Sequence, residues 1–457
     1  MVTLAPAVHR EDYGDKLIQD YMEIFNTYSI ANEAYGKISF HVILGQALRQ
    51  IHFAVGSRKI DIRVHLLLIK PQGTGKGAGY TFVERISKDL DLRFQSLTES
   101  TDAGLVGTVV YDPATKQNVV VPGLLHSADI VGMEEASVLF DYANEFSKKN
   151  MTYMQQAMNP LWDASNTITK KLGTETIEIH PHASFVLTTY PPDRLVDKLL
   201  KTGFVDRVIP IFEDVTLADR LAVIRKLSEI FNYDKALYEA KYLSVVKRFQ
   251  KVIEFGTKTG QQYITVTDDI HKLMLQIIEE FAMKILDASP KAREKLEHFI
   301  TRLYEVLFRL AAHHALISLR KHLDVSDILY ARLTYMPIWK NLIISIESLL
   351  IISPIETHRR HRIIREAIYE YDRQIKRKEF VKEGVWVRRL SMIENLQQKW
   401  DSCSKETADN NMRKIEKLPA TSYDKFSKVA QYEKDRFFEA KDIGGVIYVK
   451  KIKDIKE

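Results

Sequence analysis

The sequence predicts an α/β protein that continues into a helical block and ends in a small basic domain. Three observations carry this prediction. Short apolar runs rich in β-forming residues, such as "IDIRVHLLLIK" (60–70), recur at intervals through the first half of the chain. From about residue 215 to 350 the pattern becomes helical, with few helix-breaking residues. After Pro354 and a cluster of basic residues, helices are followed by a ribbon that turns at two glycines.

These patterns divide the chain into four parts. We expect a short helical segment over 1–55, an α/β core over 56–214, a helical lid region over 215–350 and a separate domain over 358–457. A chain of 457 residues with 45% hydrophobic residues can bury a sizeable core.

Composition narrows the class of protein. No apolar run reaches the roughly 18 residues that would suggest a membrane span. The single cysteine, Cys403, excludes an intrachain disulfide and a cysteine-based zinc finger. The first residues carry charges where a secretory signal needs an apolar segment. We therefore expect a cytoplasmic protein, associated with the nucleoid if its host is a prokaryote.

Positive charge is concentrated near the C-terminus. Residues 351–457 hold 25 Lys and Arg against 18 Asp and Glu, whereas residues 1–350 hold 41 against 42. All of the net charge of +6 therefore arises from the last hundred residues. A solvated surface is the ordinary explanation, but concentration in one domain favours a phosphate-backbone partner.

The stretch "LLLIKPQGTGKGAG" (66–79) follows an apolar strand and precedes a helix, the context that a phosphate-binding loop requires. Compared with G-x-x-x-x-G-K-[ST], it has Lys70 in place of the first glycine and Gly77 in place of the hydroxyl residue. Backbone N–H groups would bind phosphate, and Lys76 would reach the terminal phosphates. The residues expected to bind ATP are Gly73, Thr74, Gly75, Lys76, Gly77 and Ala78. A plain glycine turn is the alternative.

A second element of an ATPase is an apolar strand that ends in acidic residues. The stretch "ADIVGMEEAS" (128–137) provides it. Glu134 is at the position that holds magnesium, and Glu135 is the candidate general base. The alternative is a solvated acidic turn, which the preceding apolar strand makes less favourable.

Several segments together resemble one family. They are "TESTDAGLVGTVVYDPATKQNVVVPGLLHSADIVGMEEAS" (98–137), "MQQAMNPLWDASNTITKKLGTETIEIHPHASFVLTTYPP" (154–192), "GFVDRVIPIFED" (203–214) and "ITRLYEVLFRLAAHHALI" (300–317). Their layout is similar to the motor domain of the minichromosome maintenance (MCM) helicases over roughly residues 60–345. The resemblance implies a P-loop AAA+ ATPase core with a helical lid, working as a homo-oligomeric ring, expected to be hexameric, with ATP and Mg²⁺.

The resemblance also assigns roles residue by residue. It implies that Lys76 is the Walker A lysine, Glu134 and Glu135 the Walker B pair, Arg207 an arginine finger acting on a neighbouring subunit, Arg302 the sensor-2 arginine, and Thr189 and Tyr190 the sensor-1 position. Three residues depart from the family. Gly77 lacks the hydroxyl group, Glu134 replaces aspartate, and Tyr190 replaces asparagine, for which Thr189 could substitute. We expect an altered but active site.

Lysines in two expected hairpins suggest how the motor holds DNA. Lys116 in "DPATKQN" and Lys171 in "TITKKLG", with Lys170 beside it, would bind the phosphates of a single strand in the ring channel. Each lysine by itself is as well explained as a solvated turn residue.

The C-terminal segments "SKETADNNMRKIEKL" (404–418) and "RFFEAKDIGGVIYVKKI" (436–452) suggest a winged-helix domain, because a helix is followed by a glycine-turned ribbon. The residues expected near duplex DNA are Thr407, Asn410, Asn411, Arg413 and Lys414 on the helix and Lys450, Lys451 and Lys453 after the wing. A winged helix that binds protein is the alternative.

The sequence thus predicts an ATP-dependent DNA helicase that translocates on single-stranded DNA during replication. Only about 55 residues precede the motor, where cellular members of the family carry an OB barrel. A plasmid, virus or integrated element is the expected source. Two alternatives stay open: a replication initiator or loader that uses ATP as an assembly switch on DNA, and a P-loop phosphotransferase.

Overall fold

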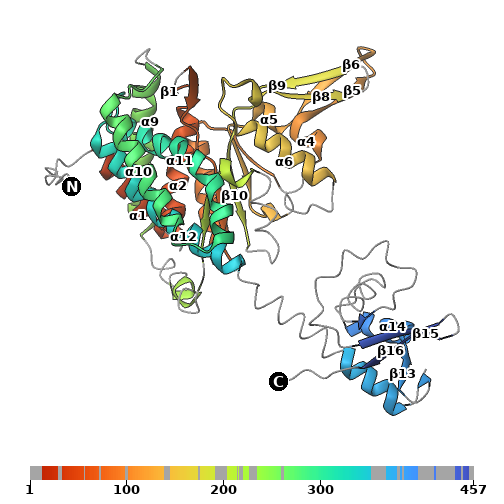
Figure 1. Ribbon diagram of the computed structural model, residues 1–457. Helices are drawn as coiled ribbons and strands as arrows, with labels where there is room; N and C mark the ends of the chain where they lie inside the picture. The colour runs from red at the N-terminus through yellow and green to blue at the C-terminus, as the bar shows by residue number, and fades with distance from the viewer. Residues whose placement is uncertain are drawn as a thin grey trace. The chain divides into compact units, whose positions relative to one another are not determined.

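The computed structural model divides the chain into two compact units, Met1–Ile351 and Ile352–Glu457 (Figure 1). The structure describes residues 13–28, 33–55, 57–71, 74–97, 101–137, 145–172, 175–190, 203–213, 215, 220–225, 234–258, 262–350, 367–377, 381–382, 385–399, 416–417, 438–443 and 446–451. None of the helices in these ranges is long and apolar enough to span a membrane.

A five-stranded parallel sheet forms the centre of the first unit, which confirms the predicted α/β class. The strands lie in the order β11-β3-β10-β7-β4. Their bounds are β3 Leu66–Ile69, β4 Phe94–Ser96, β7 Ile130–Met133, β10 Ser184–Thr189 and β11 Ile209–Phe212. Every residue of β3, β7 and β10 is buried. Both faces of these strands are therefore covered, which is why their sequences are continuous apolar runs and do not alternate.

The strand order creates a switch point beside β3. Its two neighbours, β10 and β11, come last among the five strands in chain order, whereas the next strand after β3 lies at the far edge. In open α/β sheets, ligands bind where the order reverses, outside the carboxyl ends of the strands. Helix α3 (Lys76–Asp89) begins at the carboxyl end of β3, after a short loop.

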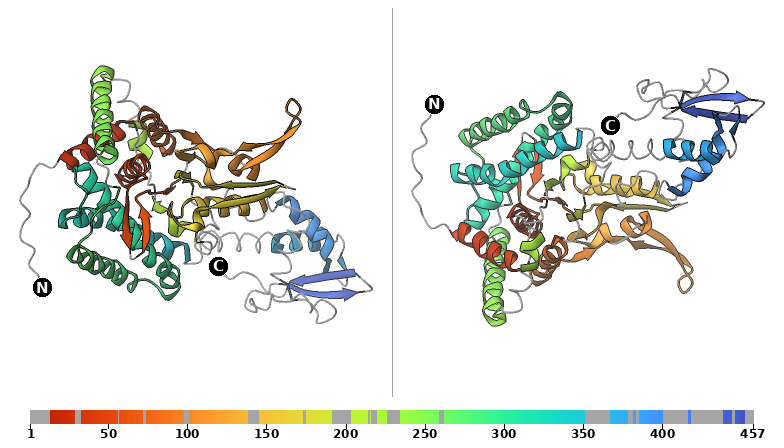
Figure 2. Two further views of the ribbon diagram at one scale, coloured as in Figure 1. Left: turned by 90° about the horizontal axis from the view of Figure 1, so that it is seen from above. Right: turned by 90° about the horizontal axis from the view of Figure 1, so that it is seen from below.

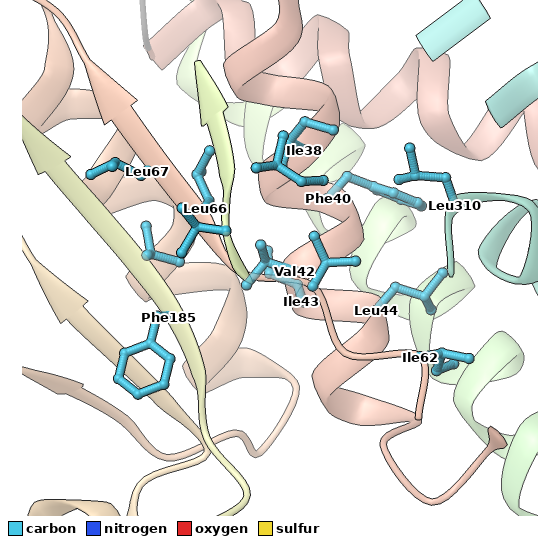
Figure 3. Packing of buried hydrophobic residues seen from close by; sticks show 14 of the residues in the cluster. Ile38, Phe40, Val42, Ile43, Leu44, Ile62, Leu66, Leu67, Phe185 and Leu310 are labelled. Atoms are coloured by element: carbon cyan, nitrogen blue, oxygen red, sulfur yellow. The ribbon is translucent and has the colours of Figure 1, made fainter. Parts of the chain in front are cut away.

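The N-terminal helices belong to the core of this unit. They are α1 (Tyr13–Tyr28) and α2 (Glu33–Ala47). Eleven of the fifteen residues of α2 are buried, because the helix lies between the sheet and the later helices. Figure 3 shows Ile38 and Val42 of α2 near Leu66 of the sheet and Leu310 of the helical block. The segment expected as a short N-terminal addition is thus part of the main hydrophobic core.

In the described part of the helical block, four helices are long: α9 (Lys235–Lys258), α10 (Asp268–Ile285), α11 (Pro290–Ile317) and α12 (Val325–Leu350). Helix α11 begins with Ser289, whose side chain accepts a hydrogen bond from the Ala292 amide, and with a proline that suits a first turn. Both α11 and α12 pack against α2, and α12 also packs against β11.

Two hairpins project from the same side of the unit (Figures 1 and 2). The first pairs β5 (Gly107–Asp112) with β6 (Gln117–Pro122), and the second pairs β8 (Ile168–Leu172) with β9 (Glu175–Ile179). Shorter elements connect these hairpins to the sheet: α4 Asp102–Val106, α5 Leu124–Ser127, α6 Glu145–Ala157 and η2 Ala164–Asn166. Strands β1 (His52–Val55) and β2 (Arg58–Asp61) pair with each other before β3, and η3 (Val205–Arg207) precedes β11. Strand β5 lies next to β9.

The second unit contains a small sheet in the order β12-β13-β16-β15-β14. Its elements are β12 Val381–Lys382, β13 Trp386–Arg388, α14 Arg389–Lys399, β14 Glu416–Lys417, β15 Phe438–Ile443 and β16 Val446–Lys451, with a further helix over 367–377. Strands β15 and β16 form the expected antiparallel ribbon. The predicted DNA-facing residues Thr407, Asn410, Asn411, Arg413, Lys414 and Lys453 lie outside the described residues.

Candidate nucleotide-binding site

The phosphate loop begins where β3 ends. The Lys70 amide donates to the Thr189 carbonyl of β10 (3.0 Å), and the Glu213 amide donates to the Ile69 carbonyl (3.0 Å). The Lys70 ammonium pairs with Glu213 at 2.7 Å, and both side chains are buried. Lys70, which replaces the first glycine of the motif, therefore links β3 to the residue that follows β11. Sequence reasoning missed this pair, since Glu213 is 143 positions further along the chain.

Gly75 shapes the entry into α3. Its φ of 81° lies in the left-handed region, which glycine adopts without steric cost. The Thr74 hydroxyl donates to the Pro71 carbonyl at 2.6 Å and closes the loop. As the N-cap residue of α3, Gly75 has no side chain with which to cap the helix. The first turn can thus present backbone N–H groups and the positive end of the helix dipole to an anion. Gly73 lies outside the described residues, and Ala78 lies in this first turn.

Lys76, the first residue of α3, is almost completely buried, with 7% of its surface exposed. Among the described residues, its Nζ atom has no hydrogen-bond partner. Oε1 of Glu135 lies 3.9 Å from Nζ, and the centroid of the Tyr190 ring lies 4.6 Å from it. Burial lowers the pKa of Lys76, while Glu135 and Glu134 oppose that shift. A buried ammonium group without hydrogen bonds is unfavourable, so an anionic ligand at this point would stabilise it.

The two acids follow β7 at the same edge of the sheet. The backbone of Glu134 is held from β10, where the Thr188 hydroxyl donates to its carbonyl at 2.5 Å. Its side chain is exposed. Glu135 is half-buried, and its Oε2 atom is buried without a hydrogen bond to any residue in the described part of the chain. Among the predicted residues, Lys76, Glu134, Glu135 and Tyr190 thus come together at one place.

The two residues expected at the sensor-1 position, Thr189 and Tyr190, make different contacts. Tyr190 contributes its ring beneath the Lys76 ammonium. Thr189 is completely buried, and its hydroxyl donates to the Tyr190 carbonyl at 3.3 Å. Thr188, which sequence reasoning did not single out, makes the link to the acidic pair. The alternation of side chains along a strand could have identified Thr188, because it points to the opposite face of β10 from Thr189.

The acidic residues suit magnesium only together with a nucleotide. Within the described part of the chain, no three His, Cys, Asp or Glu side chains cluster closely enough to hold a metal ion. Mg²⁺ usually keeps several waters and takes one or two protein carboxylates plus substrate phosphates. Glu134, exposed beside the first turn of α3, fits that role, and the metal would neutralise phosphate charge there.

The two predicted arginines lie together, and neither bonds to the acidic pair. Arg207 in η3 donates to Oδ1 of Asn159 at 3.1 Å and to the Gly203 carbonyl at 2.5 Å. Arg302 on α11 pairs with Glu305 at 3.2 Å. Burial lowers the pKa of Arg207, and the charge of Arg302 lowers it further. Among the described contacts, none joins either guanidinium to Lys76 or to its acidic neighbours.

The hairpin lysines divide into exposed and buried ones. Lys116 is exposed at the tip between β5 and β6 with a φ of 52°, and Lys171 is exposed on β8. Lys170 is buried, donating to the Gly107 carbonyl at 3.0 Å and pairing with Asp102 at 3.3 Å. The prediction that Lys170 contacts DNA does not suit this position, because its ammonium already fastens β8 to the start of β5.

The sequence matches no protein-family model and no curated protein. The geometry described above therefore carries the functional argument.

Proposed function

We propose that this protein is an ATP-dependent DNA helicase of the MCM-like AAA+ class. The observation that carries the proposal is the Lys76 ammonium, buried at the N-terminus of α3 with no hydrogen bond to any described residue and close to the carboxylates of Glu135 and Glu134. Such a group is expected where a phosphate completes the site. The open parallel sheet supports the proposal, because its switch point lies beside β3.

The acids would perform the chemistry. Mg²⁺ bound between Glu134 and the nucleotide would offset the charge of the phosphates. The half-exposed carboxylate of Glu135 would accept the proton of an attacking water. Lys76, whose Nζ lies 3.9 Å from Oε1 of Glu135, would bind the terminal phosphates beside this carboxylate.

A ring accounts for the arginines. Arg207 and Arg302 lie close to each other, and no described contact joins them to the Lys76 site of their own chain. In a heterologous ring, the same face would meet the nucleotide of the next subunit, where each arginine can stabilise negative charge. The resemblance to MCM motors supports a hexamer.

DNA would be held at two places. The hairpins expose Lys116 and Lys171 on one side of the motor, where they can bind the phosphates of a single strand. The second unit combines helices with the β15–β16 ribbon in the basic part of the chain, which supports a winged-helix domain that binds duplex. Lys450 and Lys451 lie on that ribbon.

A replication initiator or loader is the second candidate, favoured by the same site because an assembly switch also binds ATP. It would hydrolyse ATP slowly and would not separate strands. A P-loop phosphotransferase would show no stimulation by DNA.

The test is ATP hydrolysis with and without single-stranded DNA, together with nucleotide binding. The wild-type protein should hydrolyse ATP faster when DNA is present. Lys76→Ala should lose nucleotide binding, whereas Lys88→Ala, an exposed lysine near the end of the same helix, should behave like the wild type. Nucleotide binding that is unchanged in Lys76→Ala would refute the site, and hydrolysis that DNA does not affect would favour the phosphotransferase.

A further inference from the structure

Gly77 occupies the position at which a phosphate loop usually has Ser or Thr, the residue whose hydroxyl contacts Mg²⁺. Its backbone is not in the left-handed region. A Cβ at position 77 would lie only 2.6 Å from Oε1 of Glu134, so a larger residue there would require this flexible carboxylate to move. The carboxylate of Glu134 therefore lies against the first turn of α3, in the place that a side chain at position 77 would take.

The same contact between α3 and β7 contains a second pair of large and small residues. Tyr80 follows Gly77 by three positions and shares its face of α3, and Gly132 precedes Glu134 by two positions and shares its face of β7. A Cβ on Gly132 would collide with the Tyr80 hydroxyl. Tyr80 thus lies over Gly132 as Glu134 lies over Gly77. Both pairs lie where α3 contacts the end of β7.

The backbone of Glu134 is also fixed, so the length of its side chain decides where the carboxylate ends. The Thr188 hydroxyl, completely buried on β10, donates to the Glu134 carbonyl at 2.5 Å. Because helix α3 packs against β7, the Glu134 carboxylate reaches the first turn of α3 within the length of its own side chain. An aspartate at position 134 would be one methylene shorter.

We propose that Gly77 and Glu134 are a size-exchanged pair, in which the longer carboxylate fills the space of the missing hydroxyl and takes over its contact with nucleotide-bound Mg²⁺. This inference rests on the proposed ATP site and assigns the metal contact within it. An oxygen ligand with a full charge suits Mg²⁺ at least as well as a hydroxyl group does. The usual pair of a hydroxyl residue and an aspartate and this pair of a glycine and a glutamate would then each provide an oxygen ligand for nucleotide-bound Mg²⁺.

Four variants of the full chain test the exchange. Gly77→Ser and Glu134→Asp each change one member, Gly77→Ser/Glu134→Asp restores the usual pair, and Gly77→Ala/Glu134→Asp is the matched control without a hydroxyl. Affinity for N-methylanthraniloyl-ATP is measured by fluorescence in MgCl₂ and in EDTA. The measured quantity is the increase in nucleotide affinity that Mg²⁺ causes, and it does not depend on turnover. Thermal unfolding checks that each variant folds, which we expect because Gly77→Ser meets only the flexible end of Glu134.

Each single variant should lose roughly tenfold or more of the affinity gained from Mg²⁺. The Ser/Asp double variant should recover to within about threefold of the wild type, and the Ala/Asp control should not, because only non-additive effects reveal a coupled pair. Single variants that keep the full gain, or a Ser/Asp variant no better than Ala/Asp, would overturn the inference alone. A wild-type protein that binds the probe neither with nor without Mg²⁺ would overturn the proposed function and this inference with it.

Discussion

At the scale of single residues, Glu135 is the group on which hydrolysis should depend most. It is the half-buried member of the acidic pair, and one of its oxygens makes no hydrogen bond to the described residues. Glu135→Gln keeps the size of the side chain but cannot accept a proton. We expect nucleotide binding to persist while turnover falls roughly 10²–10⁴-fold, as for the loss of a general base.

Glu135→Gln is best measured as steady-state ATPase activity together with nucleotide binding in the same preparation. Glu254→Gln, an exposed residue of α9 far along the chain, serves as the control and should hydrolyse ATP normally. Turnover that Glu135→Gln leaves unchanged would assign the water-activating role to a different group.

Some of the site could be predicted from sequence, because its residues lie next to recognisable elements. Lys76 follows glycines at the end of an apolar strand, and Glu134 and Glu135 follow another. Parallel strands bring such ends to one edge. The burial of Lys170 and the Lys70–Glu213 pair could not be predicted, since each depends on a contact between segments that are distant in sequence.

At the scale of elements, α2 and α11 are joined by a pair of buried histidines. His41 and His313 are completely buried, and their Nδ1 atoms are 3.0 Å apart. Tyr330 of α12 bonds to the other ring nitrogen of His41 at 2.9 Å. Burial lowers the pKa of His313 to about 3 and that of His41 well below 6.5. Both imidazoles are therefore neutral in the folded protein near neutral pH.

This pair predicts a loss of stability in mild acid. Below about pH 6.5 the unfolded chain binds a proton at each histidine and the folded chain does not, so the free energy of unfolding rises with pH across this window. Each histidine should contribute up to about 1.4 kcal/mol between pH 7.5 and 5.5. Urea unfolding at several pH values measures this slope.

The control for the pH prediction is His41→Asn/His313→Asn. This variant can be less stable at every pH, but its free energy of unfolding should depend less on pH than that of the wild type. Equal slopes in the two proteins would mean that the pair takes up its protons in the folded state. The pKa of Asp61 is lowered to about 2, because the charges of Arg63 and Arg309 outweigh the effect of its burial. Asp61 therefore changes the free energy of unfolding only below about pH 4, outside the range in which the histidines act.

Element prediction from sequence succeeded where the pattern was local. The runs that became β3, β7 and β10 were recognisable as continuous apolar strands, and the long helices after residue 235 by their lack of breaking residues. The burial of α2 was not predicted. A helix that is apolar nearly all round gives no amphipathic signal, and only the packing of α11 and α12 against it shows that it is central.

At the scale of the whole molecule, the two compact units predict two separable activities. The first unit has its own large hydrophobic core, and the second has a small one around Val387, Phe438 and Val449. Removing residues 358–457 should therefore leave ATPase activity and ring formation largely intact. Duplex binding should weaken and lose part of its salt dependence, because each lost phosphate contact lowers the log–log slope by about 0.9.

Salt titrations of duplex affinity and ATPase assays on the same truncated protein measure both activities. A truncated protein that no longer hydrolyses ATP would show that the second unit supports the motor. Duplex affinity with an unchanged salt slope would show that the basic charge of this unit serves another partner.

The central claim is that ATP hydrolysis drives strand separation, and unwinding of a forked DNA duplex tests it most directly. With ATP and Mg²⁺, the wild-type protein should separate the strands, as should Lys88→Ala. Lys76→Ala should not, because it cannot bind nucleotide, and Lys171→Ala should hydrolyse ATP but unwind poorly, because the strand is no longer held by the β8–β9 hairpin. ATP hydrolysis by the wild type without any strand separation would contradict the account and favour the initiator or loader.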